Sequence, residues 1–143
     1  PNAWEDEMFI LQAKFSKGIF SHETALYIHG LTDRTPMKYS MVFPYGYHAI
    51  SVKTENISER HAVKEIYNLG ITTDKSPCGN NIRLYNIEKT LCDVVKASCD
   101  VQIVNDAMKR YAKSQNKNIK LLYEYADILR VKNKIANYME VLL

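Results

Sequence analysis

Apolar residues recur at helical spacing at the start of the chain. Within DEMFILQAKFS, residues 6–16, apolar side chains stand three and four positions apart, and Gly18 ends the pattern. A second short helix is predicted in SHETALYIHG, residues 21–30, where Ser21 suits the N-cap and Gly30 suits the C-terminal stop. The chain therefore opens with two short amphipathic helices.

The middle of the chain has the pattern of β-structure. KYSMVFP is predicted to be a strand that ends at Pro44, and YGYHAISVKTENISERHAV is predicted to form a helical turn followed by a strand near residues 57–63. ITTDKSP and NNIRLYN are two further β-like runs, joined through Cys78, Gly79 and Asn80. Small and turn-forming residues at such a junction are typical of a hairpin.

Beyond Asn86 the apolar period becomes helical and stays so. Three helices are predicted over residues 87–98, 101–114 and 119–143, the last with a break near residues 130–133. The order of elements predicts an α+β fold, with a small central sheet and hairpin region flanked by N-terminal helices and a C-terminal helical bundle. No repeat or internal linker is found, so residues 1–143 are interpreted as a single domain.

The segment SHETALYIHGLTD, residues 21–33, has the form of the first half of a helix-turn-helix, a helix followed by a glycine turn. The recognition helix would have to begin after Thr32, but Pro36 and the β-rich KYSMVFP follow at once. We therefore do not expect a helix-turn-helix at this position.

The length and cysteine content indicate a chain that folds without disulfides. A chain of 143 residues buries enough surface to fold without disulfides or metals. Its three cysteines lack CxxC spacing, and no stretch approaches the roughly 20 apolar residues of a membrane helix. We expect a cytoplasmic protein with reduced cysteines. Because the chain begins at Pro1 and not at a methionine, it is interpreted as a fragment or a processed form of a larger protein.

The net charge of +3 is unevenly distributed. Between positions 109 and 134 the only acidic residues are Glu124 and Asp127, and the basic residues are Lys109, Arg110, Lys113, Lys117, Lys120, Arg130, Lys132 and Lys134. Two interpretations stay open, a solvated helix face and a surface for nucleic acid or an acidic partner. The candidate binding residues are Lys109, Arg110, Lys113, Lys117 and Lys120, with Met108 and Tyr111 facing inward.

The residues most suggestive of chemistry lie in RLYNIEKTLCDVVK, residues 83–96. Asn86 suits the N-cap of a helix, and Glu88 lies in its first turn, so both have a structural explanation. Asp93 is about 140° around the helix from Glu88, so the two carboxylates are not expected to share a site. A nuclease of the Glu-x-Lys type is also disfavoured, because Glu88 and Lys89 are adjacent.

Other catalytic motifs are absent from the sequence. The histidines at 22, 29, 48 and 61 do not have zinc-site spacing, and no Walker loop, GxGxxG or Gly-x-Ser-x-Gly motif occurs. We therefore predict no catalytic residue, no metal and no cofactor.

Several segments, in order along nearly the whole chain, resemble the C-terminal domain of the AbiEi antitoxins of abortive-infection systems. They are GIFSHETALYIHGLTDRTP, FPYGYH, YNLGI, CGNNIRLYNIEKTLCDVVK and YADILRV with YMEVLL. That family has a Tyr-x-x-Glu-Arg-Thr-x-x-Asp signature, which is matched here by Tyr85, Glu88, Lys89, Thr90 and Asp93. Lys89 replaces the arginine and lacks its bidentate fork, so we expect the signature to cap and pack a helix, not to clamp a carboxylate or phosphate.

The resemblance implies an antitoxin and transcriptional-regulator domain of a type IV toxin–antitoxin system active in phage defence. Its functional counterpart would be a nucleotidyltransferase toxin, which need not contact it. Operator DNA would be bound mainly by an N-terminal winged helix, which we do not find in this chain. No membrane partner is expected, and self-association is left open. The alternative function is a basic accessory nucleic-acid-binding module without an antitoxin role.

Overall fold

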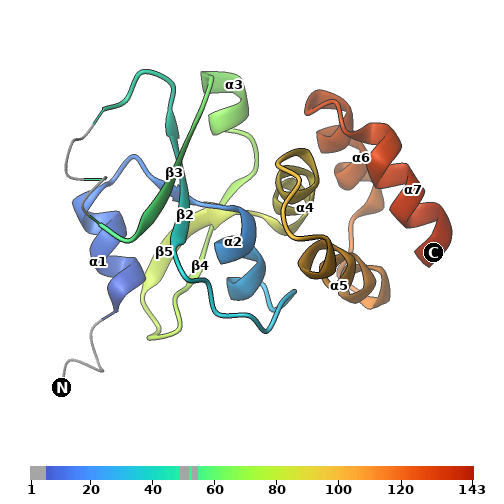
Figure 1. The fold of residues 1–143 in the computed structure, drawn as a ribbon, viewed down its shortest axis with the longest axis horizontal. Coiled ribbons are helices and arrows are strands. Elements are labelled where there is room, and N and C mark those ends of the chain that lie inside the picture. Colours follow the sequence, from blue (N-terminus) through green and yellow to red (C-terminus); the bar gives the residue numbers. More distant parts are fainter. Residues whose placement is uncertain (1–5, 49–51, 53–54) are drawn as a thin grey trace.

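The protein has an α+β fold in which helices cover both faces of a mixed sheet (Figure 1). The computed structural model describes residues 6–48, 52 and 55–143. Its helices are α1 (Glu7–Lys14), α2 (His22–Ile28), α3 (Lys64–Tyr67), α4 (Ile87–Lys96), α5 (Val101–Lys113), α6 (Ile119–Ile128) and α7 (Lys132–Leu142). Its strands are β1 (Ile19–Phe20), β2 (Tyr39–Pro44), β3 (Ile57–Ala62), β4 (Ile71–Lys75) and β5 (Asn81–Tyr85).

The five strands lie in the order β3-β2-β1-β5-β4. The β2–β3 and β1–β5 pairs are parallel, whereas the β1–β2 and β4–β5 pairs are antiparallel. The β4–β5 pair is the hairpin expected from the sequence, with Ile71 opposite Tyr85 and Lys75 opposite Asn81. The last residue of β5 therefore lies inside the sheet and leads directly into α4.

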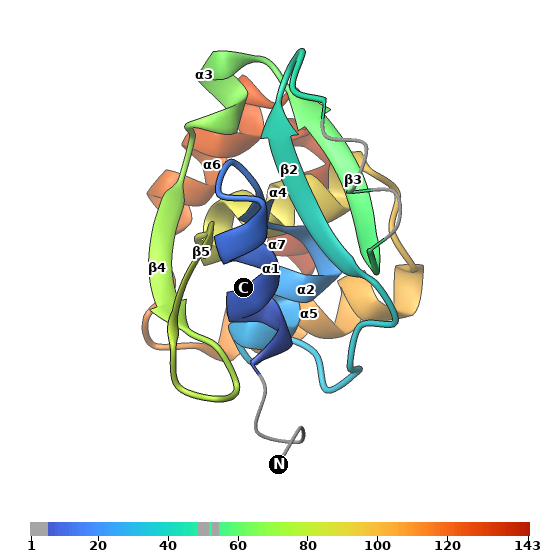
Figure 2. The same ribbon diagram turned by 90° about the vertical axis from the view of Figure 1, so that its left-hand side faces the viewer.

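The sheet separates α1 from the C-terminal helices, as the view along the sheet normal shows (Figure 2). Met8 and Leu11 of α1, and Phe15 directly after it, pack with strand residues such as Phe43 and Leu84 in one buried cluster. Helix α1 forms as predicted, because the Asp6 carboxylate caps it by accepting a hydrogen bond from the Phe9 amide. This arrangement leaves the opposite face of the sheet to α2 and α4.

The C-terminal helices form a second buried cluster around α4. Its members come from α2, the loop that follows α2, and α4 to α7. They include Leu91, Met108, Leu122 and Ile135, all fully buried. Helix α4 runs between this cluster and the sheet (Figure 1), so it is almost entirely enclosed.

The structure confirms most elements predicted from the pattern. The helical break near residue 130 and the absence of a helix between α2 and β2, in a segment that the structure describes, are both as expected. Strand β1 and helix α3 were not predicted, because two residues and a single turn are too short to show a period. The helical turn predicted before β3 lies largely outside the described residues.

Candidate functional site

The signature residues lie at the junction of β5 and α4. The Asn86 side chain accepts a hydrogen bond from the Lys89 amide at 2.9 Å, which is the N-cap predicted from the sequence. Every residue from Glu88 to Val95 is buried. The polar side chains of this helix therefore need partners inside the protein.

Lys89 and Asp93 form a buried ion pair, one helical turn apart. The Lys89 ammonium donates to Asp93 Oδ2 at 2.9 Å and lies 3.9 Å from the centroid of the Tyr85 ring. The side chains are only 2% and 9% exposed. Burial raises the pKa of Asp93, and the Lys89 ammonium opposes that shift only in part. The expectation that Lys89 would not clamp a carboxylate was wrong: a single ammonium bond replaces the bidentate fork.

Glu88 faces a different set of partners, as expected. Its Oε2 accepts from the Tyr111 hydroxyl at 2.8 Å and from the Asn118 amide at 3.3 Å. The Tyr111 hydroxyl also accepts from the Asn118 amide, at 2.9 Å. Burial and the hydrogen bond to Glu88 both raise the pKa of Tyr111. Glu88 therefore ties α4 to α5 and to the start of α6.

Thr90 and Tyr85, the two remaining signature residues, donate hydrogen bonds to backbone carbonyls. The Thr90 hydroxyl donates to Tyr85 O at 3.2 Å, and the Tyr85 hydroxyl donates to Tyr67 O at 2.6 Å. Burial raises the pKa of Tyr85 well above its usual range. All five signature side chains are thus engaged internally, which agrees with the structural role predicted for them.

The five candidate basic residues lie along α5 and at the start of α6, but they differ in their surroundings. Lys109, Lys113 and Lys120 are exposed, and Met108 and Tyr111 on the same stretch are buried as predicted. Arg110 is engaged with the loop after α2, and Lys117 donates to the Ser114 carbonyl at 2.9 Å. Of the five predicted residues, Lys109, Lys113 and Lys120 therefore remain as candidates for binding.

Arg110 holds the loop after α2 against α5. Its guanidinium donates to both carboxylate oxygens of Asp33, at 3.1 and 2.7 Å, and to Gly30 O at 3.1 Å. The Arg110 charge and hydrogen bonds lower the pKa of Asp33. A bidentate pair of this kind occupies the fork that a phosphate would otherwise use.

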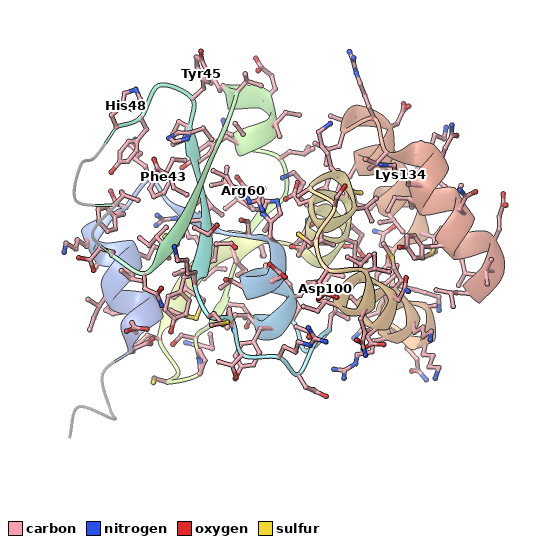
Figure 3. The ribbon with its side chains drawn as sticks, in the orientation of Figure 1. Phe43, Tyr45, His48, Arg60, Asp100 and Lys134 are labelled. Atoms are coloured by element: carbon pink, nitrogen blue, oxygen red, sulfur yellow. The ribbon has the colours of Figure 1, made fainter. Side chains whose placement is uncertain are left out.

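A cleft beside α4 brings together residues that the sequence analysis did not connect. It has a volume of about 520 Å³ and lies between the sheet, α3, α4 and the corner that joins α6 to α7. Figure 3 shows Arg60 projecting from β3 into the space in front of α4. The polar lining residues are His22, Arg60, His61, Lys89, Asp93, Lys96 and Arg130.

The cleft contains more positive than negative groups. Among the described residues that line it, Asp93 is the one carboxylate; burial raises its pKa, and the charges of Lys89, Arg60 and Lys96 offset that rise only in part. His22 is buried beside two of these cations, which with desolvation lower its pKa to about 3. The imidazole is therefore neutral at physiological pH and makes a 2.7 Å hydrogen bond with the Ser21 hydroxyl.

The described residues contain neither a metal site nor a membrane-spanning helix. Within the part of the chain that the structure describes, no group of three or more His, Cys, Asp or Glu residues could hold a metal ion. No helix in that part is long and apolar enough to cross a bilayer. Cys92 and Cys99 do not bridge, and burial raises the pKa of the Cys92 thiol to about 12.

Comparison with protein-family models and with curated proteins finds no match for this chain. The site is therefore interpreted from its own geometry. Sequence reasoning missed the cleft because its basic residues stand at positions 22, 60, 61, 89, 96 and 130, far apart along the chain. The one local signal was the strand pattern of ISERHA, which predicted that Arg60 would stand on a sheet.

Proposed function

We propose that the chain is a non-catalytic antitoxin and transcriptional-regulator domain of a type IV toxin–antitoxin system. It would act in the cytoplasm, oppose a nucleotidyltransferase toxin and contribute to autoregulation within the full-length protein. The observation that best supports this proposal is the enclosure of the signature residues. A general acid or base must be free to exchange a proton with its substrate, whereas Glu88, Lys89 and Asp93 are each bonded to other protein groups.

The proposal also rests on the resemblance of ordered sequence segments to the AbiEi C-terminal domain. A search of the genomic neighbourhood for an adjacent nucleotidyltransferase gene is its cheapest test. Co-expression of the full-length protein with that toxin should then restore growth. No rescue by a folded protein would contradict the antitoxin role.

Substitution of Glu88 tests whether the signature is catalytic. Glu88→Gln keeps an oxygen acceptor for Tyr111, so we expect the variant to rescue growth with a slightly lower melting temperature. Asp106→Asn on the exposed side of α5 is the matched control. A Glu88→Gln variant that melts like the wild type but no longer rescues growth would show that the carboxylate has a chemical role.

The second candidate function is an accessory nucleic-acid-binding module. The exposure of Lys109 and Lys113 on neighbouring turns of α5, and of Lys120 on α6, favours it, because phosphate contacts need accessible cations. This module would have no antitoxin role, and the salt dependence of DNA binding distinguishes a contacting surface from a solvated one.

A further inference from the structure

The cleft between the sheet and α4 has the size of a small-molecule site. Its volume of about 520 Å³ falls within the range of roughly 300–1,000 Å³ that ligand pockets usually have. Beside its polar groups it is lined by apolar side chains, among them Val42, Ile66, Ile128 and Leu129. A ligand that fits this lining would combine an apolar portion with a charged one.

The charge of the cleft selects an anion. Arg60, Lys89, Lys96 and Arg130 are set against the single carboxylate of Asp93, which is already bonded to Lys89. Lys96 makes one of its three possible hydrogen bonds, to Leu129 O at 2.9 Å. Two guanidinium groups and part of an ammonium therefore have donors left for a ligand.

Arg60 supplies a second, independent indication. Its Nε is buried and has no hydrogen-bond partner among the residues that the structure describes. A buried cationic donor without an acceptor is destabilising, and proteins seldom leave one. Arg60 also lines the cleft, so a negatively charged ligand bound there would compensate the charge of this partly buried guanidinium.

The backbone conformation of Arg130 is a further indication of a ligand in the cleft. Its φ is +61°, in the left-handed region, and it follows the last turn of α6. The Val131 amide bonds to Ala126 O and the Arg130 amide to Asp127 O, the pattern of a helix end that glycine usually completes. Arginine stands at this position although glycine would be less strained.

We propose that this cleft binds a small phosphorylated molecule about the size of a nucleoside monophosphate. The guanidinium groups of Arg60 and Arg130 and the Lys96 ammonium bind its phosphoryl group, since planar guanidinium forks match phosphate oxygens. The apolar residues contact its remaining part. This binding is independent of the antitoxin proposal, because it can be measured on the isolated chain.

Calorimetric titration with AMP, inorganic phosphate and adenosine tests the site. We expect AMP to bind more tightly than phosphate, and adenosine to bind more weakly than AMP by about tenfold or more, the effect of losing charge-assisted hydrogen bonds. Equal affinity for AMP and adenosine, or no binding of AMP at about 10 mM, would overturn the proposal.

Arg130→Gly separates ligand binding from folding. Glycine relieves the left-handed strain, so the melting temperature should stay level or rise, while the affinity for AMP should fall about tenfold. Lys96→Met should weaken AMP binding similarly. The control is Lys132→Gln, an exposed charge loss on α7 outside the cleft lining, which should leave affinity unchanged. Wild-type affinity in both cleft variants would overturn the proposal.

Competition with DNA distinguishes the small ligand from a nucleic-acid backbone. A single-stranded oligonucleotide without a terminal phosphate should not displace AMP, because the cleft is sized for one phosphoryl group. If the oligonucleotide displaced AMP stoichiometrically, and if Arg130→Gly abolished its binding, the cleft would be a site for backbone phosphates. That result would overturn the small-molecule proposal.

Discussion

Lys89 and Asp93 illustrate how a buried ion pair depends on both partners. Each charge has left water, and their attraction and the Tyr85 ring offset the loss of hydration. Removing one partner leaves the other as a buried charge without a counter-ion, which is destabilising. Removing both leaves an apolar site that nearby side chains can fill.

We therefore expect Lys89→Met or Asp93→Leu alone to lower the free energy of unfolding by about 3–5 kcal/mol. The double variant should lose clearly less than the sum of the two single losses. Urea unfolding of the three proteins measures this. Lys14→Met, which breaks the exposed pair with Glu55, is the control and should cost under about 1 kcal/mol. Additive losses in the double variant would contradict a coupled pair.

His22 makes stability depend on pH. Its pKa is about 3 in the folded protein against the usual 6.5 of an exposed histidine, so below pH 6.5 the unfolded chain binds the additional proton. Stability from this group is complete above pH 6.5 and falls by roughly 1.4 kcal/mol per pH unit below it, about 2 kcal/mol at pH 5. The prediction is a steep loss of unfolding free energy in acid.

Chemical denaturation at neutral and acidic pH measures this loss. His22→Asn should flatten the slope, and asparagine tolerates the φ of +52° that His22 adopts. Part of the slope should remain, because burial also lowers the pKa of His29. Parallel pH profiles for wild type and His22→Asn would exclude His22 as the source.

At the scale of elements, the start of α4 depends on the close approach of the turn after α3. Gly70 has a φ of +81°, and a Cβ placed on it would lie 2.9 Å from the Lys89 Cβ. Gly70→Ala should therefore lower stability by about 2 kcal/mol or more, from backbone strain and the clash together.

Gly79 in the β4–β5 hairpin is the matched control. Its φ is +92°, but a Cβ there would meet nothing within 4 Å. Gly79→Ala should cost only the strain, about 1 kcal/mol. Thermal unfolding compares the two variants, and equal losses would show that the contact with α4 is unimportant.

The helix ends also contain strain that can be removed. Ser98 and Arg130 follow α4 and α6 with φ of +53° and +61°. Glycine at either position should raise the free energy of unfolding by about 1 kcal/mol, measured by denaturation. A loss of stability in Ser98→Gly would contradict this reasoning, since Ser98 does not line the cleft beside α4.

At the scale of the whole molecule, the basic surface predicted on α5 and α6 can be tested through its exposed lysines. Reversing Lys109, Lys113 and Lys120 to Glu should lower the DNA affinity of the full-length protein and reduce its salt dependence by about one unit of slope per lost contact. Arg110 is left unchanged because Asp33 already binds it. Operator affinity at two salt concentrations is the measurement.

The control reverses Lys38, Lys64 and Lys75, which are exposed in other parts of the chain. It changes the net charge equally, so a general electrostatic effect would lower the DNA affinity of both triple variants alike. An unchanged slope in the α5–α6 variant, with an intact fold, would identify the surface as merely solvated.

The sequence by itself determined the elements whose signals are local. The Asn86 cap and the break between α6 and α7 depend on residues within a few positions of one another, and the β4–β5 hairpin was indicated by the turn residues at its tip. The hydrogen bond of the cap closes inside one helical turn, so period and residue type were sufficient for these elements. The separate environments of Glu88 and Asp93 followed from helix geometry in the same way.

Only the tertiary structure decided which charges pair and which stay available. Lys89 is buried because α4 lies between two cores, and Arg110 is bound because the loop after α2 packs against α5. The cleft exists because β3, α4 and the α6–α7 corner converge around Arg60. These contacts join residues tens of positions apart, and no local pattern encodes them, since they arise from the packing of apolar faces elsewhere in the molecule.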